Sequence, residues 1–345
     1  MIHSTGPLSR ARVRFFTLLA LLCAAPLAAR PAFRGYYTGT LGGRFAIQMD
    51  LTIDSSAAIT GNYFYETVGE RLNLQGRLGT PTLLEELDSG DNVTGRFAGS
   101  LAPPYASFEG NWTSADGTKS LPFTLLRVAE YHFYSTEDEL IQAEAAFPRF
   151  AGRTPAWRQL NSKLHTQAMV AHGQFVHDSD EMLAAEELYA GMRCGYSHDC
   201  SIMYYSDDLI SLLITEWSFT GGAHGNTSYA AENYWRQADR FQPLALADLF
   251  LPQADYAAAL ARLCAQSLRA QGAAWVQQGE IKTFSGEDLQ VFNVMPRALV
   301  FTFAPYAVGP YAQGTFHVRV PYRQLDEVLD PAGPLKRLLS FKQPQ

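Results

Sequence analysis

The sequence predicts an α+β C-terminal domain, an antiparallel sheet with helices, preceded by a small all-β antiparallel sandwich or barrel. Residues 33–127 alternate apolar and polar positions between glycine-rich turns, which is typical of strands. Helical spacing of apolar residues enters after residue 128. The chain has 345 residues, 47% hydrophobic and 18% charged, so it is long enough to bury two cores and has the composition of a folded protein. We therefore expect domains at residues 33–127 and 128–345.

The first 29 residues have the pattern of a secretory signal peptide. Arg10, Arg12 and Arg14 precede an apolar run that is too short to span a bilayer comfortably, and the small pair Ala28-Ala29 follows it. We expect cleavage after Ala29 and a periplasmic or secreted product that is not an integral membrane protein. A retained membrane anchor is the alternative.

Nucleic acid is a poor candidate for the partner. The 27 Lys and Arg residues are outnumbered by 34 Asp and Glu residues, and the formal net charge is −7. No run of basic residues along the sequence could neutralise successive phosphates.

The N-terminal part reads as a meander of about six to eight strands. In residues 45–53, Phe45, Ile47, Met49, Leu51 and Ile53 would all point to one side. Three short segments, residues 60–63, 94–97 and 109–112, place a glycine two residues before an aromatic residue. This spacing suits strands that bend at glycine and fill the space beneath with an aromatic ring.

The C-terminal part mixes helices and strands. The expected helices cover residues 137–146, 155 to about 177, and 255–277. The expected strands cover residues 209–219, a second strand that ends near Trp235, and segments near 292, 299–303 and 315–320.

Three cysteines remain after the signal peptide. In an exported protein, Cys194 and Cys200, placed in a predicted loop, are expected to form a disulfide. A metal site of these two thiols with His198 is the alternative, but it lacks an evident fourth ligand. Cys264 lies on the apolar face of a predicted helix, where we expect a buried free thiol.

Residues 219–226 (FTGGAHGN), preceded by residues 207–212 (DDLISL) and followed by residues 304–314 (APYAVGPYAQG), carry a family resemblance. This combination resembles the RsiV-like domain of unknown function of exported bacterial proteins. Some of its members form the outer half of lysozyme-sensing anti-sigma factors, and others lie beside peptidoglycan deacetylase domains. Residues 146–150 (AFPRF) resemble the companion domain that precedes it. The resemblance implies a companion segment at residues 128–190 and a core at 191–325.

The chain departs from both kinds of relative. The sequence shows neither a later membrane-spanning segment with a sigma-binding part nor a deacetylase domain with paired Asp and His-x-x-x-His ligands. The resemblance therefore implies an exported module associated with the cell wall or with something that attacks it.

The candidate site is the glycine-rich connection around His224. Gly221 and Gly222 permit a tight turn that brings backbone N–H groups close to a ligand, although the same glycines can serve the turn alone. Asn226 follows, and Tyr306 and Tyr311 flank a second bend. Tyrosine rings stack on sugars and serve interfaces, and they also fill cores.

These residues favour a non-catalytic binding protein for a peptidoglycan fragment or a protein such as lysozyme. We assign no catalytic residue, metal or cofactor. The alternative is an envelope polysaccharide hydrolase or deacetylase-type enzyme that uses His224 as a general base or metal ligand. His165 and His172, about 10 Å apart on one helix, are too distant to share an ion unaided. A further alternative, an assembly factor, depends on free edge strands in the β-domain.

Overall fold

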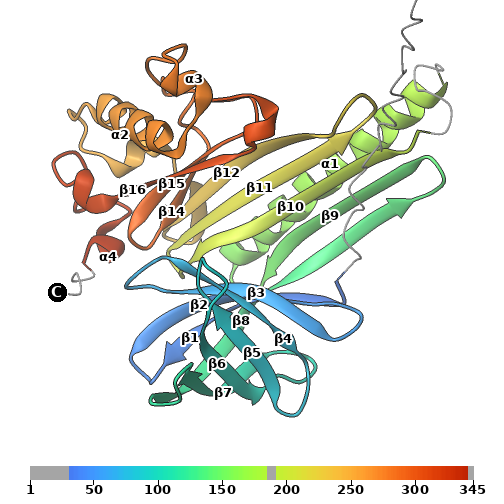
Figure 1. Cartoon of the computed structure of the whole chain (residues 1–345), viewed down its shortest axis with the longest axis vertical. Coiled ribbons are helices and arrows are strands. Elements are labelled where there is room, and N and C mark those ends of the chain that lie inside the picture. Colours follow the sequence, from blue (N-terminus) through green and yellow to red (C-terminus); the bar gives the residue numbers. More distant parts are fainter. Residues whose placement is uncertain (1–30, 185–191, 341–345) are drawn as a thin grey trace, which may run out of the picture.

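The computed structural model describes residues 31–184 and 192–340, so the predicted signal peptide lies outside the described part (Figure 1). The described residues form a 13-stranded sheet, in the order of the sequence, and a separate three-stranded sheet. The first eight strands close into a barrel because β1 also pairs with β8. The predicted fold class is confirmed.

The large sheet contains β1 (Phe33–Leu41), β2 (Phe45–Ile53), β3 (Ala58–Tyr65), β4 (Arg71–Arg77), β5 (Thr82–Leu87), β6 (Val93–Ser100), β7 (Ser107–Ser114), β8 (Ser120–Glu137), β9 (Ile141–Phe150), β10 (Cys194–Tyr205), β11 (Leu209–Phe219), β12 (Asn226–Gln237) and β13 (Arg240–Pro243). The small sheet contains β14 (Phe292–Met295), β15 (Ala298–Phe303) and β16 (Phe316–Pro321). The helices are α1 (Pro155–Ala184), α2 (Tyr256–Gln271), α3 (Ala274–Gln277) and α4 (Lys336–Leu339), and three short 3-10 turns are η1 (Leu246–Leu249), η2 (Tyr311–Gln313) and η3 (Tyr322–Gln324).

The barrel is filled by the side chains that the alternation pattern placed inside. Ile47, Met49 and Leu51 are fully buried, together with the aromatic residues Tyr63 and Phe97 of the glycine-aromatic segments. The glycines are needed for strand approach, because a Cβ at position 61 or 110 would lie 2.1 Å from a carbonyl oxygen of the neighbouring strand. Closure also leaves the described barrel without the free edge strands that the assembly-factor alternative required.

Strand β8 belongs to both halves of the molecule. Its first part pairs with β1 and β7 inside the barrel, and residues from Ala129 to Glu137 pair with β9 in the open sheet. The expected boundary between residues 127 and 128 thus falls within one continuous strand of 18 residues.

The predicted helix over residues 137–146 is wrong. The acidic run forms a hairpin turn, in which Asp138 accepts hydrogen bonds from the backbone N–H groups of Leu140 and Ile141, and β9 follows. Residues 141, 143, 145 and 147 of β9 are buried with a period of two. Pairing with β8 on one side and, in parallel, with β10 on the other outweighs the helix propensity of the Glu and Ala residues.

The predicted helix that begins at Pro155 is confirmed as α1, which crosses one face of the sheet (Figure 1). It buries Trp157, Leu160, Leu164 and Ala168 against β9 to β12. None of the described helices is both long and apolar enough to span a bilayer.

The C-terminal lobe packs on the opposite face of β10 to β12. The side chain of Asn233 donates to the carbonyl of Phe292, and Asn293 of β14 donates to Ser211 Oγ. The expected helix over residues 255–277 is present as α2 and α3, because Gly272 ends α2 in a left-handed conformation with φ of +86°. Helix α2 covers β16 and buries Cys264, as predicted.

Candidate functional site

The glycine-rich connection joins β11 to β12. Gly221 and Gly222 have φ values of +115° and +94°, which side-chain-bearing residues rarely adopt, so the chain reverses here only because both positions are glycine. Gly225 serves a different purpose: a Cβ there would lie 2.3 Å from Nε1 of Trp217. The connection therefore lies directly on the indole ring.

A second loop, between β15 and β16, meets this connection. The imidazole of His224 stacks on the ring of Tyr311, with centroids 3.6 Å apart and planes inclined by 11°. The hydroxyl of Tyr311 donates to the Gly225 carbonyl at 2.9 Å, and Nδ1 of His224 lies 2.8 Å from the same oxygen. Because a carbonyl oxygen only accepts, Nδ1 is the donor in this hydrogen bond.

Tyr306 completes an aromatic cluster, defined as His224, Tyr306 and Tyr311. Its hydroxyl lies 3.4 Å from Nε2 of His224, and its ring centroid lies 5.6 Å from that of Tyr311. The side chain is 51% exposed, although its backbone φ is +68°. The local fold thus holds an exposed aromatic ring on a backbone conformation that is unfavourable for a bulky residue.

The structure therefore brings three of the predicted site residues together from two loops that are distant in sequence. Gly221 and Gly222 shape the first loop, and Asn226 is exposed as the first residue of β12, opposite Ser218. That these six residues bind a ligand remains a prediction.

The predicted Cys194–Cys200 disulfide is wrong. The two residues lie six positions apart on the single extended strand β10, about 20 Å end to end, whereas a disulfide needs Cα atoms within about 7 Å. Both thiols are free and buried, and burial raises the pKa of each. The predicted loop is a strand because its alternate residues pack under α1.

His198, the third residue of the alternative metal site with Cys194 and Cys200, is paired with a carboxylate. Its Nδ1 is 3.1 Å from Oε1 of Glu216, which also accepts from the hydroxyl of Tyr196 at 2.8 Å. The hydrogen bond from His198 lowers the pKa of Glu216. Residues 31–184 and 192–340 contain no group of three or more His, Cys, Asp or Glu side chains that could hold a metal ion.

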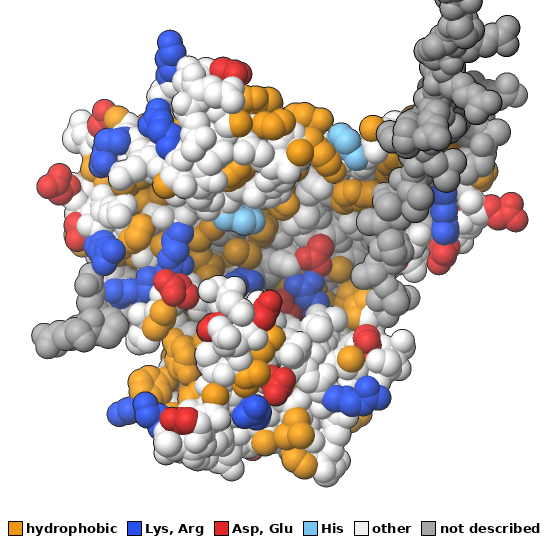
Figure 2. All heavy atoms as spheres, viewed as in Figure 1, with side chains coloured by type: hydrophobic (Ala, Val, Ile, Leu, Met, Phe, Trp, Pro, Cys, Tyr) orange, Lys and Arg blue, Asp and Glu red, His pale blue; other side chains and the backbone are white. Residues whose placement is uncertain are grey.

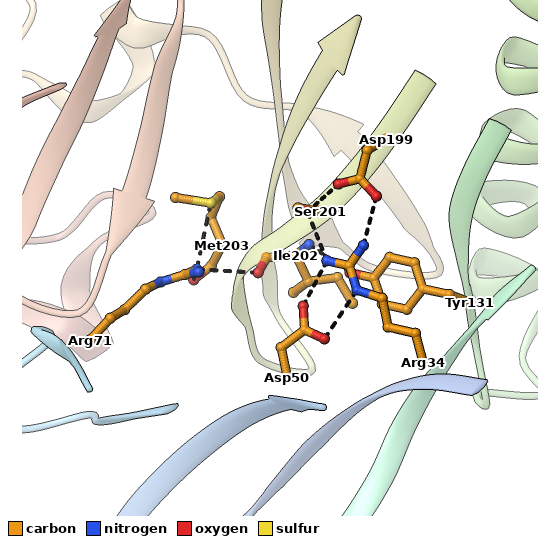
Figure 3. A network of polar contacts seen from close by, with 8 residues as sticks. All are labelled: Arg34, Asp50, Arg71, Tyr131, Asp199, Ser201, Ile202 and Met203. Atoms are coloured by element: carbon orange, nitrogen blue, oxygen red, sulfur yellow. Dashed lines mark hydrogen bonds and ion pairs between the residues drawn. The ribbon is translucent and has the colours of Figure 1, made fainter. Parts of the chain in front are cut away.

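An ionic network at the junction of barrel and sheet was not predicted from the sequence (Figure 3). Arg34 of β1 donates to both carboxylate oxygens of Asp50 at 3.1 and 2.8 Å, and to Asp199 of β10 at 2.6 Å. It also donates to Ser201 Oγ at 2.8 Å and lies 3.9 Å above the ring of Tyr131. Burial opposes its charge, but Asp50, Tyr131 and Asp199 together raise the pKa of Arg34 well above its ordinary value.

Two residues of the network, Arg34 and Asp199, line a hollow of about 460 Å³ between barrel and open sheet. Phe133 and Tyr134 contribute apolar surface, and Ser197 and the half-exposed Asp199 contribute polar groups. Arg34 and Asp199 are 165 residues apart, so no local motif could have revealed their contact.

Fold and site together define an α+β protein whose N-terminal barrel shares a strand with its open sheet. Within this protein, residues 134–227 match the family model described as "Deacetylase PdaC", and residues 247–323 match the one described as "Protein of unknown function (DUF3298)". The first match includes the His224 connection and ends just inside β12, and the second contains Tyr306 and Tyr311. The PdaC match agrees with the part of the sequence resemblance that concerns deacetylase-associated regions.

Two solved structures are similar to part of the chain. A DUF3298 family protein from Pseudomonas aeruginosa is 16% identical, with a TM-score of 0.43 over 59% of this chain and 93% of the other. A DUF3298 family member from Bacteroides fragilis is 15% identical, with a TM-score of 0.37 over 62% and 98%. The comparison with curated proteins found no match.

Proposed function

We propose that this chain is an exported, non-catalytic protein of the cell envelope that binds a peptidoglycan fragment at the aromatic cluster. The observation that carries the proposal is Tyr306, half exposed on a backbone with positive φ. Such strain costs on the order of 1 kcal/mol and tends to occur where function requires it. Here it holds a tyrosine ring beside the stacked pair of His224 and Tyr311.

The cluster has the chemistry that a sugar ring requires. Aromatic faces pack against the apolar C–H face of a sugar, and the hydroxyl of Tyr306 and Nε2 of His224 offer polar partners at its edge. The match to a family described as a deacetylase, which includes this connection, supports an envelope glycan over other ligands.

The enzyme alternative rests on His224 as a general base or metal ligand. Within the described residues, the contacts of His224 are the Gly225 carbonyl and the two tyrosine rings, and no carboxylate orients its Nδ1. This arrangement favours a binding surface over a hydrolytic site, since a catalytic histidine is ordinarily oriented and supported by a third group.

Calorimetric titration of the chain without residues 1–29 with soluble, muramidase-released peptidoglycan fragments tests the proposal. Tyr306→Ala and His224→Ala should each weaken binding at least tenfold, equivalent to about 1.4 kcal/mol, with nearly unchanged melting temperature. Tyr134→Ala is the matched control, because Tyr134 is 48% exposed but lies in the separate hollow.

The outcomes separate the alternatives. Binding that only Tyr134→Ala weakens would place the ligand in the hollow and overturn the proposed site. Binding of lysozyme without binding of any glycan fragment would replace the ligand class. Release of acetate or of new reducing ends during incubation, abolished by His224→Ala, would establish the enzyme.

A further inference from the structure

A second hollow, of about 490 Å³, lies where the β3–β4 turn of the barrel meets the C-terminal lobe. Three arginines line it: Arg297 from the β14–β15 turn, Arg319 from β16 and Arg323 from η3. The carboxylates in its lining belong to the exposed residues Glu70 and Asp326. We call this feature the arginine hollow.

Arg319 is fixed in place by the barrel. Its Nη1 donates to the Gly69 carbonyl at 3.0 Å and its Nη2 to the Val68 carbonyl at 3.2 Å. Gly69 has φ of +72°, a backbone conformation that side-chain-bearing residues rarely adopt, so glycine lets the turn present both carbonyls to Arg319. Within residues 31–184 and 192–340, two of the five N–H groups of the guanidinium are used, which leaves three for another acceptor.

The charge of Arg319 is incompletely compensated. Burial lowers its pKa, Glu70 acts in the opposite direction, and the neighbouring charge of Arg297 lowers it further. The ion pairs within 4.0 Å among residues 31–184 and 192–340 include neither Arg319 nor Arg323. A half-buried guanidinium beside another cation is unfavourable until an anion joins it.

The arginine hollow also departs from the charge of the whole chain. The formal net charge is −7, yet Lys and Arg side chains gather on the left of Figure 2, where the C-terminal segment meets the barrel. Arg297, Arg319 and Arg323 are not consecutive in the sequence, and the Val68 carbonyl that holds Arg319 is 251 residues away from it, so the sequence alone showed no basic cluster.

We propose that the arginine hollow binds an oxyanion, namely a phosphate or carboxylate group of a ligand. The planar guanidinium presents paired N–H groups that match the oxygens of either anion. Arg319 provides a fixed, half-buried donor at the wall, and Arg323 provides an exposed donor at the rim. This site is separate from the aromatic cluster and does not depend on the function proposed above.

Calorimetric titration with inorganic phosphate at constant ionic strength, using the chain without residues 1–29, tests the proposal. We expect saturable binding that Arg319→Gln and Arg323→Gln each weaken at least tenfold. Because Arg319→Gln also removes two hydrogen bonds to the barrel, the exposed Arg323→Gln keeps the test valid if the former variant is poorly folded. Arg240→Gln, an exposed arginine of the β12–β13 hairpin, is the matched control.

Further arms identify the source of the anion. Glycerol phosphate represents a soluble phosphate ester, galacturonate a sugar carboxylate, and phosphatidylglycerol vesicles a lipid phosphate. Arginine-dependent binding of any of these supports the oxyanion site and names its source. Three results would overturn it: no saturable binding of any probe up to about 50 mM anion, equal weakening by Arg240→Gln, or unchanged binding in both hollow variants.

Discussion

Removal of Arg34 should be among the most damaging single substitutions in this protein. In Arg34→Met, the aliphatic stem is replaced but Asp50, whose side chain is only 8% exposed, loses its cation and two hydrogen bonds. Breaking a buried ion pair in this way costs about 3–5 kcal/mol. The loss of the Arg34–Asp199 ion pair adds little to this cost, because the side chain of Asp199 is 39% exposed and exposed ion pairs contribute about 1 kcal/mol or less.

Urea unfolding measures the effect as a shift in the midpoint at constant slope. Asp199→Asn is the comparison variant and should cost about 1 kcal/mol or less. The double variant Arg34→Met, Asp50→Leu should recover at least half of the loss, since it removes the unpaired buried charge. A cost for Arg34→Met no larger than that of Asp199→Asn, or no recovery in the double variant, would refute the reasoning.

Three other predictions follow from buried groups and close contacts. Burial lowers the pKa of His172. The contribution of the neutral imidazole to stability is therefore present above the unfolded pKa near 6.5 and is lost as the pH falls through the folded pKa. His172→Gln should flatten the decrease in melting temperature between about pH 7 and pH 5. Gly225→Ala should cost about 1–3 kcal/mol in urea unfolding because its Cβ overlaps Trp217, whereas Gly173→Ala in α1 meets open space and should stabilise by up to about 1 kcal/mol. Dithiothreitol should leave the melting temperature unchanged, and the denatured, unreduced chain without residues 1–29 should titrate with three free thiols, Cys194, Cys200 and Cys264.

Each of these has a contradicting result. If the melting temperature falls equally with pH in His172→Gln and in the parent protein, His172 does not contribute to the loss of stability in acid. Equal effects of the two glycine substitutions would show that the Trp217 contact does not limit the site. A count of one free thiol would show that Cys194 and Cys200 form a disulfide after all.

The fold was predictable wherever the apolar pattern had one clear period. The alternation through Met49 and Leu51 placed the barrel interior correctly, and the Trp157 to Ala168 stripe placed α1. The helix prediction for residues 137–146 failed because the acidic and alanine-rich composition of this segment favours a helix locally. Its two neighbouring strands, which lie elsewhere in the sequence, impose the extended form.

Site residues that stand out in the local sequence were predicted, and those whose partners are distant in sequence were not. His224 was conspicuous between glycines, and Tyr306 and Tyr311 flanked a visible bend, although their mutual contact depends on tertiary packing. Arg34 and Arg319 carried no local signal, since their partners come from distant strands and turns. Buried charge networks are defined by the tertiary fold. The disulfide prediction failed because the segment from Cys194 to Cys200 was taken for a loop, whereas its pairing with neighbouring strands makes it extended.

Strand β8 has a mechanical consequence. A hinge between two halves of a protein normally lies in a flexible linker whose dihedral angles absorb the rotation. Here the connection is an extended segment with hydrogen-bonded neighbours in both halves. A torque applied at the barrel by a bound macromolecule would therefore be transmitted to β9 as a tilt of the open sheet, and separation of the halves would first require unzipping that strand.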